Sequence, residues 1–301
     1  MSGGTERVGV VGCGLMGAGV AEVCARAGAR VTVVERDAAS ARAGLERITR
    51  SLDRAVRDEK LTGPGRDAAL ERVHVVDDLA ALHDSGLVVE AVAEDERVKL
   101  DVFARLDGAV RRADAVLATN TSSLPVIRLA TATSRPQNVI GVHFFNPVPV
   151  LRLVELVPSL LTSESTARRA EAFVVDTLGK EVVLAQDRAG FVVNALLVPY
   201  LLAAIRMVES GAARAEDVDR GMVMGCAHPL GPLALTDLIG LDTTRAIAES
   251  LYAEFREPLY APPPLLCRMV EAGLLGRKSG RGFHTYSGDG TRGERLAAGG
   301  T

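Results

Sequence analysis

A strand, a glycine-rich turn and a helix open the chain, and together they restrict its fold more than any other feature. The apolar, β-branched run over residues 7–11 predicts a strand. Residues 15–27 have the apolar spacing of a helix that ends at Gly28, and residues 30–34 predict a second strand. A strand–helix–strand unit of this kind indicates a parallel sheet with right-handed crossovers.

The turn, Gly12-Cys-Gly-Leu-Met-Gly17, contains the pattern G-x-G-x-x-G. The pattern alone is weak in a chain with 30 glycines, but here it follows a strand, opens a helix and precedes Glu35 by about 20 residues. Gly12 would permit the tight turn and Gly14 would let the backbone approach a pyrophosphate at the helix N-terminus. Gly17 would let helix and strand pack closely. The context predicts a dinucleotide-binding site.

The acidic residue at the end of the second strand bears on which dinucleotide is bound. Glu35 would accept hydrogen bonds from the adenine ribose and repel a 2′-phosphate, which favours NAD over NADP. Arg36 acts in the other direction because a guanidinium can neutralise that phosphate. We therefore expect NAD as the cofactor, with NADP as the open alternative.

One crossover of the predicted sheet is much longer than the others. Further strands are expected over residues 73–76, 87–92 and 115–119, with a helix over 99–110. Between residues 34 and 73 the chain predicts two helices instead of one, broken at Leu61-Thr-Gly-Pro-Gly65. This helical hairpin is either an insertion without a role or a clamp for a bulky substrate, whose charged groups would face Arg54, Arg57 and Lys60.

The pattern changes after the linker Asp187-Arg-Ala-Gly190. Only helices are expected there, over residues 191–209, 215–225, 232–239, 241–255 and 264–272. The predicted fold is therefore α/β: a Rossmann-like doubly wound sheet with a helical hairpin insertion, followed by an all-α C-terminal domain. We expect a dinucleotide-binding domain over residues 1–187 and a helical substrate and dimerisation domain over 188–301, with a disordered tail after residue 287.

Charge and cysteine usage exclude several classes of function. The net charge of −3 gives no electrostatic basis for binding nucleic acid or an anionic membrane. Residues 191–208 are apolar, but they include Asn194 and Arg206 and are expected to form a buried helix instead of a membrane span. The four cysteines lack C-x-x-C spacing, so we expect reduced thiols, no metal site and, without a signal peptide, a cytoplasmic protein.

Two strands around the turn signal Pro147-Val-Pro149 place an imidazole opposite a carboxylate. If residues 138–145 and 151–157 pair antiparallel about Pro149, residue i faces residue 298 − i, and His143 faces Glu155. Facing residues point to the same side of a sheet with Cβ atoms about 5 Å apart. A carboxylate there would fix the imidazole tautomer and stabilise its protonated form, as a general base requires. The pair alone is equally consistent with a structural role.

Hydroxyl side chains are expected at the same edge of the sheet. Residues 115–120 form a parallel strand, so Thr121, Ser122 and Ser123 emerge at its carboxyl end, where a nicotinamide site would lie. The structural alternative is that Ser123 caps the helix after Pro125. Asn194, near the start of the helical domain, could reach the same site.

Several motifs in order along the chain resemble those of the 3-hydroxyacyl-CoA dehydrogenases, closest to the bacterial 3-hydroxybutyryl-CoA dehydrogenases. They are Gly12–Gly19, Val89–Glu94, Asn120–Leu124, His143–Pro149, Leu153–Glu155, Gly190–Asn194, His228–Pro232, Gly240–Asp242 and Gly276–Phe283. The resemblance runs from Val8 to about Tyr286. It implies a homodimer that uses NAD to oxidise an (S)-3-hydroxyacyl-CoA, of short chain as in 3-hydroxybutyryl-CoA, reversibly to the 3-ketoacyl-CoA.

The resemblance also assigns roles to individual residues. It implies His143 as the catalytic base, Glu155 as its partner, and Ser122 and Asn194 as groups that hold the substrate. The cofactor-contacting positions that it implies are Gly12, Gly14, Leu15, Met16, Gly17, Glu35, Glu94, Lys99, Ser122, Asn146 and Lys278. Arg54 and Lys60 on the helical hairpin would contact CoA. The chain departs from the family at Glu35, where many relatives carry Asp, and at Arg152, where some carry Lys.

Two rival functions remain at this point. One is a dehydrogenase of the same fold that acts on a hydroxy acid or sugar acid without CoA. The other is a non-catalytic NAD-binding protein, against which the complete set of Ser122, His143, Glu155 and Asn194 argues.

Overall fold

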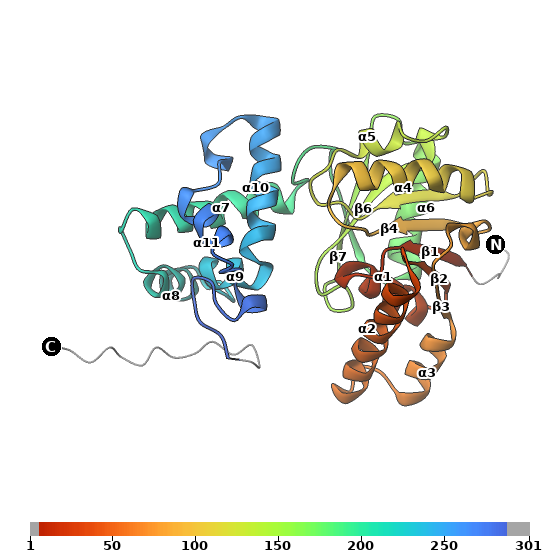
Figure 1. Cartoon of the computed structure of the whole chain (residues 1–301), viewed down its shortest axis with the longest axis horizontal. Coiled ribbons are helices and arrows are strands. Elements are labelled where there is room, and N and C mark those ends of the chain that lie inside the picture. Colours follow the sequence, from red (N-terminus) through yellow and green to blue (C-terminus); the bar gives the residue numbers. More distant parts are fainter. Residues whose placement is uncertain (1–5, 288–301) are drawn as a thin grey trace. The chain divides into compact units, whose positions relative to one another are not determined.

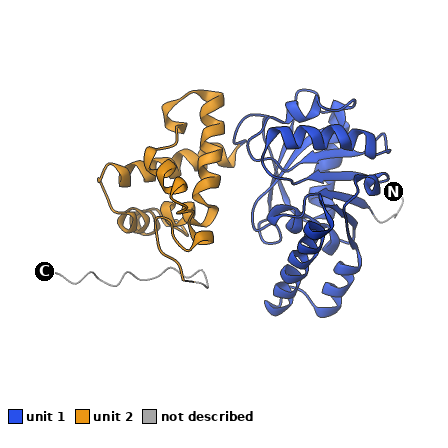
Figure 2. Cartoon of the chain, viewed as in Figure 1, with its two compact units in different colours: residues 1–191 blue, residues 192–301 orange. Residues whose placement is uncertain are grey.

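The computed structural model describes residues 6–287 of the chain. It divides into two compact units, with the division between Phe191 and Val192 (Figure 2). The first unit contains the sheet and the second is helical. Each is described by itself.

The first unit is built on one sheet with the strand order β3-β2-β1-β4-β5-β6-β7-β8 (Figure 1). Strands β1 to β6 are parallel, β7 is antiparallel to β6, and β8 is parallel to β7. The strands are β1 (Arg7–Val11), β2 (Arg30–Val34), β3 (Val73–Val76), β4 (Leu87–Glu90), β5 (Val116–Thr119), β6 (Val139–Phe144), β7 (Leu153–Pro158) and β8 (Glu181–Leu184). The strand order reverses between β1 and β4, and ligands of doubly wound sheets bind outside the carboxyl ends of the strands at such a point.

Helices cover both faces of this sheet, which explains why its central strands are continuous apolar runs. One hydrophobic cluster joins the sheet to α1 (Leu15–Arg26), α2 (Ala38–Arg57), α3 (Gly63–Glu71) and α6 (Glu164–Ala172). The other joins the opposite face to η1 (Leu79–Leu82), α4 (Glu96–Ala109) and α5 (Val126–Ala130). Helices α2 and α3 form the crossover between β2 and β3, which confirms the predicted helical hairpin. A 3₁₀ turn, η2 (Pro136–Asn138), precedes β6, and a π-helical segment, η3 (Phe173–Thr177), continues α6.

Two parts of the sheet differ from the sequence prediction. Strand β4 ends at Glu90, earlier than expected, because the Glu90 carboxylate accepts a hydrogen bond from the backbone of Val92 and turns the chain out of the sheet. After β7 the sequence suggested nothing before the linker, but α6, η3 and β8 lie there. Strand β8 is a mostly exposed edge strand of only four residues, too short to give a clear alternation.

The second unit contains helices close to those predicted. They are α7 (Val193–Glu209), α8 (Ala215–Cys226), α9 (Pro232–Ile239), α10 (Leu241–Phe255) and α11 (Pro264–Glu271), with short turns η4 (Pro258–Tyr260) and η5 (Arg277–Ser279). Within residues 6–287, none of the helices combines the length and the apolar character that crossing a membrane requires.

Two buried carboxylates fasten the end of this unit to α9. Asp237 accepts hydrogen bonds from the backbone of Phe283 and His284 and from the Tyr286 hydroxyl. Asp219 accepts from the His284 ring at 2.7 Å and from the first backbone N–H groups of α9. His284 is therefore a buried structural histidine. The tail expected after residue 287 lies outside the described residues.

Candidate active site

The glycine-rich loop has the geometry that its sequence predicts. Gly12 has a φ of +89°, and a Cβ atom at Gly17 would lie 1.9 Å from the Gly12 carbonyl oxygen, so both positions require glycine. A Cβ at Gly14 would meet no protein atom within 4 Å. Gly14 begins α1 without a side-chain cap, which leaves the N-terminal N–H groups of the helix available to an anion. The loop thus fits a pyrophosphate in front of Gly14.

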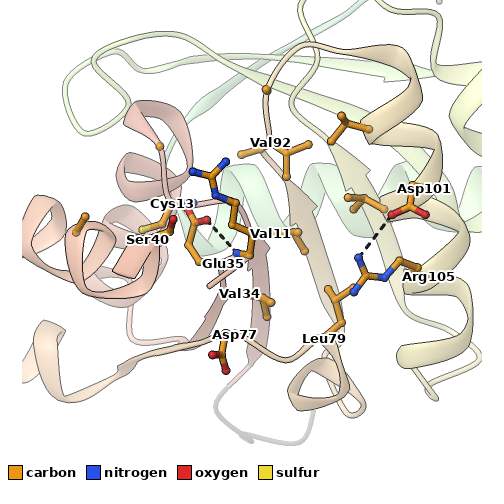
Figure 3. A pocket seen from close by; sticks show the side chains of 18 of the residues that line it. Val11, Cys13, Val34, Glu35, Ser40, Asp77, Leu79, Val92, Asp101 and Arg105 are labelled. Atoms are coloured by element: carbon orange, nitrogen blue, oxygen red, sulfur yellow. Dashed lines mark hydrogen bonds and ion pairs between the residues drawn. The ribbon is translucent and has the colours of Figure 1, made fainter. Parts of the chain in front are cut away.

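A cavity of about 630 Å³ opens beside this loop (Figure 3). The loop, the end of β2 and one side each of α2 and α4 contribute to its walls, and Glu35, Ser40, Asp77, Val92 and Asp101 are among the residues that line it. Its volume is within the range of cofactor pockets. The cavity lies at the carboxyl ends of β1, β2 and β4, where the adenosine half of a dinucleotide would be expected.

Glu35 is held in place on the glycine-rich loop. One of its carboxylate oxygens accepts a hydrogen bond of 2.6 Å from the backbone N–H of Cys13, and the other accepts from the backbone of Arg36 (Figure 3). Burial and the charge of Glu35 raise the pKa of the Cys13 thiol to about 12, so Cys13 is protonated at neutral pH and serves as a packing residue. Arg47 from α2 donates to the Cys13 carbonyl and ties this helix to the loop.

His143 and Glu155 form the predicted pair. Strands β6 and β7 pair in the register in which His143 faces Glu155, and Ile140 facing Pro158 keeps the same sum, which confirms the predicted hairpin. The His143 Nδ1 and Glu155 Oε2 atoms are 2.7 Å apart, and 7% and 0% of the two side chains are exposed. Because an ionised carboxylate only accepts hydrogen bonds, Nδ1 carries the ring hydrogen and donates a hydrogen bond to Glu155. The Nε2 atom then keeps a lone pair that can accept a proton.

Two aromatic rings hold the imidazole from its sides. The ring of Phe145 lies 4.6 Å from the His143 ring, and Phe191 makes an edge-on contact at 5.5 Å between ring centroids. Phe191 has a φ of +49°, which a bulky side chain rarely adopts. Strain of this kind persists where the surrounding structure over-determines a position, and it clusters at functional sites. Neither ring contact follows from a local pattern in the sequence.

The turn between β6 and β7 is anchored to the body of the unit. Lys180 donates from its ammonium to the carbonyl oxygens of Val148 and Leu151, at 2.7 and 2.6 Å. Val148 also packs against Gly19 of α1, where an added Cβ would come within 2.8 Å. Asn146, expected to contact the cofactor, is exposed at the start of this turn, and its peptide bond to Pro147 is cis. The turn therefore fixes the hairpin that carries His143 and Glu155.

Residues 121–123 follow β5 and gather around one carboxylate. The Glu94 Oε1 atom accepts hydrogen bonds from the Thr121 hydroxyl at 2.5 Å, from the Ser122 backbone at 2.9 Å and from both the backbone and the hydroxyl of Ser123 at 3.2 Å. The Ser122 hydroxyl lies 3.4 Å from the same oxygen. Ser123 is thus not the cap of α5, because Asp187 accepts the first backbone N–H groups of that helix instead.

The charge of Glu94 is stabilised by its surroundings. Burial by itself would raise the pKa of Glu94, but the ammonium of Lys99 and the hydrogen bonds from residues 121 and 122 together lower it below its ordinary value. Glu94 is therefore ionised at neutral pH and accepts from the loop.

Asn120 connects this loop to the β6–β7 hairpin that carries His143 and Glu155. Its side-chain oxygen accepts a hydrogen bond of 2.9 Å from the backbone N–H of Phe144, the residue after His143. Strands β5 and β6 are parallel neighbours, so their carboxyl ends, with Ser122 and His143, lie at the same edge of the sheet. The position of Asn120 at a strand end was a signal that could have indicated this role.

The remaining residues expected in the site lie elsewhere in the chain. Arg54 and Lys60 belong to the end of α2 and the turn after it, both exposed, and Lys60 lies 3.7 Å from Asp58. In the second unit, Asn194 is a buried residue at the start of α7, and the ammonium of Lys278 pairs with Asp242 at 2.6 Å. Within residues 6–287 there is no cluster of three His, Cys, Asp or Glu side chains that could hold a metal ion.

Comparison with known proteins gives consistent results for both units. The NAD-binding domain of 3-hydroxyacyl-CoA dehydrogenase matches residues 7–188, and the C-terminal domain of the same family matches residues 190–286. A 3-hydroxybutyryl-CoA dehydrogenase of Mycobacterium tuberculosis is 59% identical over 95% of this chain and 100% of its own length.

Solved structures agree. The crystal structure of M. tuberculosis FadB2 superposes with a TM-score of 0.93 at 59% identity, over 94% of this chain and 99% of that chain. The crystal structure of the (S)-3-hydroxybutyryl-CoA dehydrogenase PaaH1 from Ralstonia eutropha superposes with a TM-score of 0.88 at 43% identity. The match covers 94% of this chain and 100% of that chain.

Proposed function

The chain belongs to the 3-hydroxyacyl-CoA dehydrogenase family, and we propose that it oxidises short-chain (S)-3-hydroxyacyl-CoA, above all 3-hydroxybutyryl-CoA, reversibly to the 3-ketoacyl-CoA. The cofactor is NAD. The observation that supports the reaction most directly is the buried hydrogen bond between His143 and Glu155 at the edge of the sheet that carries Ser122.

The protein's part in this reaction follows from the tautomer of His143. NAD, when bound, supplies the hydride acceptor. Since Nδ1 of His143 donates to Glu155, Nε2 has the lone pair that takes the proton from the C3 hydroxyl of the substrate. Glu155 stabilises the imidazolium that results. In the direction of reduction the same Nε2–H returns its proton to the carbonyl oxygen.

Further residues are proposed to hold the two ligands. Ser122 and Asn194 orient the substrate oxygen and donate to the negative charge that develops on it. Gly12, Gly14 and Gly17, with Leu15 and Met16 at the start of α1 and Glu35 in the adjoining cavity, hold the dinucleotide. Glu94, Lys99, Asn146 and Lys278 complete the cofactor-contacting set proposed from the family. We propose that residues 1–187, within the first unit, are the dinucleotide-binding domain and that residues 188–301 are the helical substrate and dimerisation domain.

The helical hairpin is proposed to bind the phosphates of CoA through Arg54 and Lys60. We expect Arg54→Ala and Lys60→Ala each to raise KM for acetoacetyl-CoA about fivefold, because an exposed ion pair contributes about 1 kcal/mol in water, while kcat is unchanged. Arg50→Ala is the matched control, since Arg50 lies on the same helix and pairs with Glu46. With acetoacetyl-pantetheine, which lacks those phosphates, the variants should match the native enzyme; an equal rise in KM there would contradict this role.

We also propose that the second unit forms a homodimer. Its helices expose large apolar side chains that a dimer interface could cover: 74% of Leu196, 79% of Met224 and 50% of Leu238 are exposed. Sedimentation should give twice the chain mass of 31.7 kDa for the native protein, and the single-chain mass for Met224→Glu. Leu160→Glu in the first unit is the control and should remain dimeric. A native monomer would exclude the dimer proposal.

A cytoplasmic location is also proposed, in keeping with the free thiols of the four cysteines.

The test of the function is a spectrophotometric assay at 340 nm in the direction of reduction. We expect NADH oxidation with acetoacetyl-CoA at a kcat/KM above that with longer 3-ketoacyl-CoA substrates, and a much lower rate with NADPH. Free acetoacetate serves as the control for the CoA-free alternative. A higher kcat/KM with the free acid, or no turnover with any 3-ketoacyl-CoA, would refute the proposal.

A further inference from the structure

Lys99 is buried between two carboxylates. Its ammonium lies 2.6 Å from Glu90 Oε1 and 3.3 Å from Glu94 Oε2. Only 1% of the Lys99 side chain and none of the Glu90 side chain are exposed. Replacing a buried ion pair by apolar groups of similar volume is often neutral or even stabilising. Stability is therefore a weak explanation for these charges.

Glu90 is rigidly anchored within the sheet. Besides Lys99, its Oε1 atom accepts a hydrogen bond of 2.7 Å from the backbone of Val92, and its Oε2 atom accepts one of 2.7 Å from the hydroxyl of Thr119 on β5. Both carboxylate oxygens are thus bonded to groups that do not move independently of β4 and β5. Glu90 consequently holds the ammonium of Lys99 at a fixed place at the end of these strands.

Glu94 transmits this position to the loop. Its Oε2 atom faces Lys99, while its Oε1 atom accepts from Thr121, Ser122 and Ser123. A contiguous chain of contacts therefore runs from Glu90 through Lys99 and Glu94 to the loop that carries Ser122. About a third of the Glu94 side chain is exposed, whereas Lys99 is enclosed.

We propose that Glu90 and Lys99 are positioning residues for the reaction: their buried ion pair fixes the Glu94 carboxylate and through it the Ser122 loop. Glu90, which has no exposed surface, then acts only through Lys99, and Lys99 acts on the loop through Glu94 in addition to the cofactor contact proposed for it from the family. The proposal rests on the proposed function only in so far as Ser122 takes part in catalysis. The contacts themselves exist in the ligand-free protein.

The first test is Lys99→Met, which keeps the approximate volume and removes the charge. We expect hydrogen–deuterium exchange of the backbone N–H groups of Ser122 and Ser123 to become faster in the ligand-free protein. We expect kcat for acetoacetyl-CoA reduction to fall about a hundredfold, since a misplacement of about 1 Å can cost that much. The Kd for NADH, measured by fluorescence, should rise about tenfold or less, since Lys99 is also a proposed cofactor contact, and this rise is much smaller than the fall in kcat. A rise in this Kd as large as the fall in kcat would overturn the proposal.

A second variant covers the case in which Lys99→Met does not fold. The double variant Glu90→Gln/Lys99→Met removes both charges of the pair, and a Gln amide can still accept from Val92 and contact Thr119. We expect Tm to return towards the native value, with kcat still low and exchange at residues 122 and 123 still fast. Native kcat and native exchange in this variant would show that the pair is only structural.

Asp107→Asn is the matched control. Asp107 lies on α4, the helix of Lys99, and pairs with Arg135 at 3.0 Å with little of either side chain exposed. Its loss should lower Tm but leave kcat and the exchange of residues 122 and 123 unchanged; a similar fall in kcat would contradict a specific role for the Lys99 pair. If the native enzyme fails to reduce any 3-ketoacyl-CoA, the proposed function fails, whereas the exchange measurement still decides the link from Lys99 to the loop.

Discussion

Replacement of His143 by Gln is expected to lower kcat for acetoacetyl-CoA reduction by about 10²–10⁴-fold, the usual contribution of a general acid–base group. Gln can occupy the same space and can donate to Glu155, but it cannot accept and return a proton at the position of Nε2. The buried hydrogen bond of 2.7 Å and the two flanking aromatic rings leave little freedom for another group to replace it. Stopped-flow and steady-state assays at 340 nm would measure the loss.

Cofactor binding should survive this change. The glycine-rich loop precedes α1, the cavity beside Glu35 is built from this loop, β1, β2, α2 and α4, and His143 is not among the residues that line the cavity. The Kd for NADH should therefore stay within about threefold of the native value. His74→Gln is the matched control, because His74 is an exposed histidine on β3 of the same unit. A kcat within tenfold of native for His143→Gln would remove His143 from the mechanism.

Replacement of Glu155 by Gln is expected to lower kcat by about 10²–10⁴-fold. The lower limit corresponds to the loss of a hydrogen bond to a charged group, and the upper limit to an imidazole held in the wrong tautomer. Gln can present its N–H₂ group to Nδ1, and the proton then resides on Nε2, where the reaction needs a lone pair. Within residues 6–287, Glu155 is the carboxylate that Nδ1 contacts, and its side chain has no exposed surface.

The neighbouring strand provides the control for Glu155. Glu181 on β8 is an exposed carboxylate that pairs with Arg152 at the surface, and Glu181→Gln should leave kcat unchanged. Circular dichroism and Tm would separate misfolding from loss of chemistry. Near-native kcat in a folded Glu155→Gln enzyme would mean that the carboxylate is only structural, as the sequence by itself allowed.

The parts of the fold that the sequence predicted well share a physical cause. Strands β1 and β2 are buried on both faces and form continuous apolar runs, so their limits are sharp. The hairpin register followed from centring the turn signal Pro147-Val-Pro149 between two apolar runs, and the pairs from Ile140 to Phe144 all keep it. Local pattern decides these elements.

The parts that were missed depend on contacts between distant residues. Glu90 appears in the sequence as one charge at the end of an apolar strand, and its role depends on Lys99 and Thr119 from other elements. The helix after Pro125 is capped by Asp187, about sixty residues away, and no local pattern predicts a cap from that distance. Ser123 was a reasonable local candidate, but Glu94 binds its hydroxyl instead.

The hairpin that joins His143 to Glu155 has a consequence for how such a chain can vary. Side chains alternate faces along a strand, so a shift of one residue in the pairing would turn one member of the pair to the opposite face of the sheet. The turn from Phe145 to Arg152, fixed by Lys180, should therefore accept exchanges of residues but not the gain or loss of one. The crossover through α2 and α3 sets no such register, and its length is free to drift. Insertions and deletions among descendants of this gene should collect there and avoid the turn.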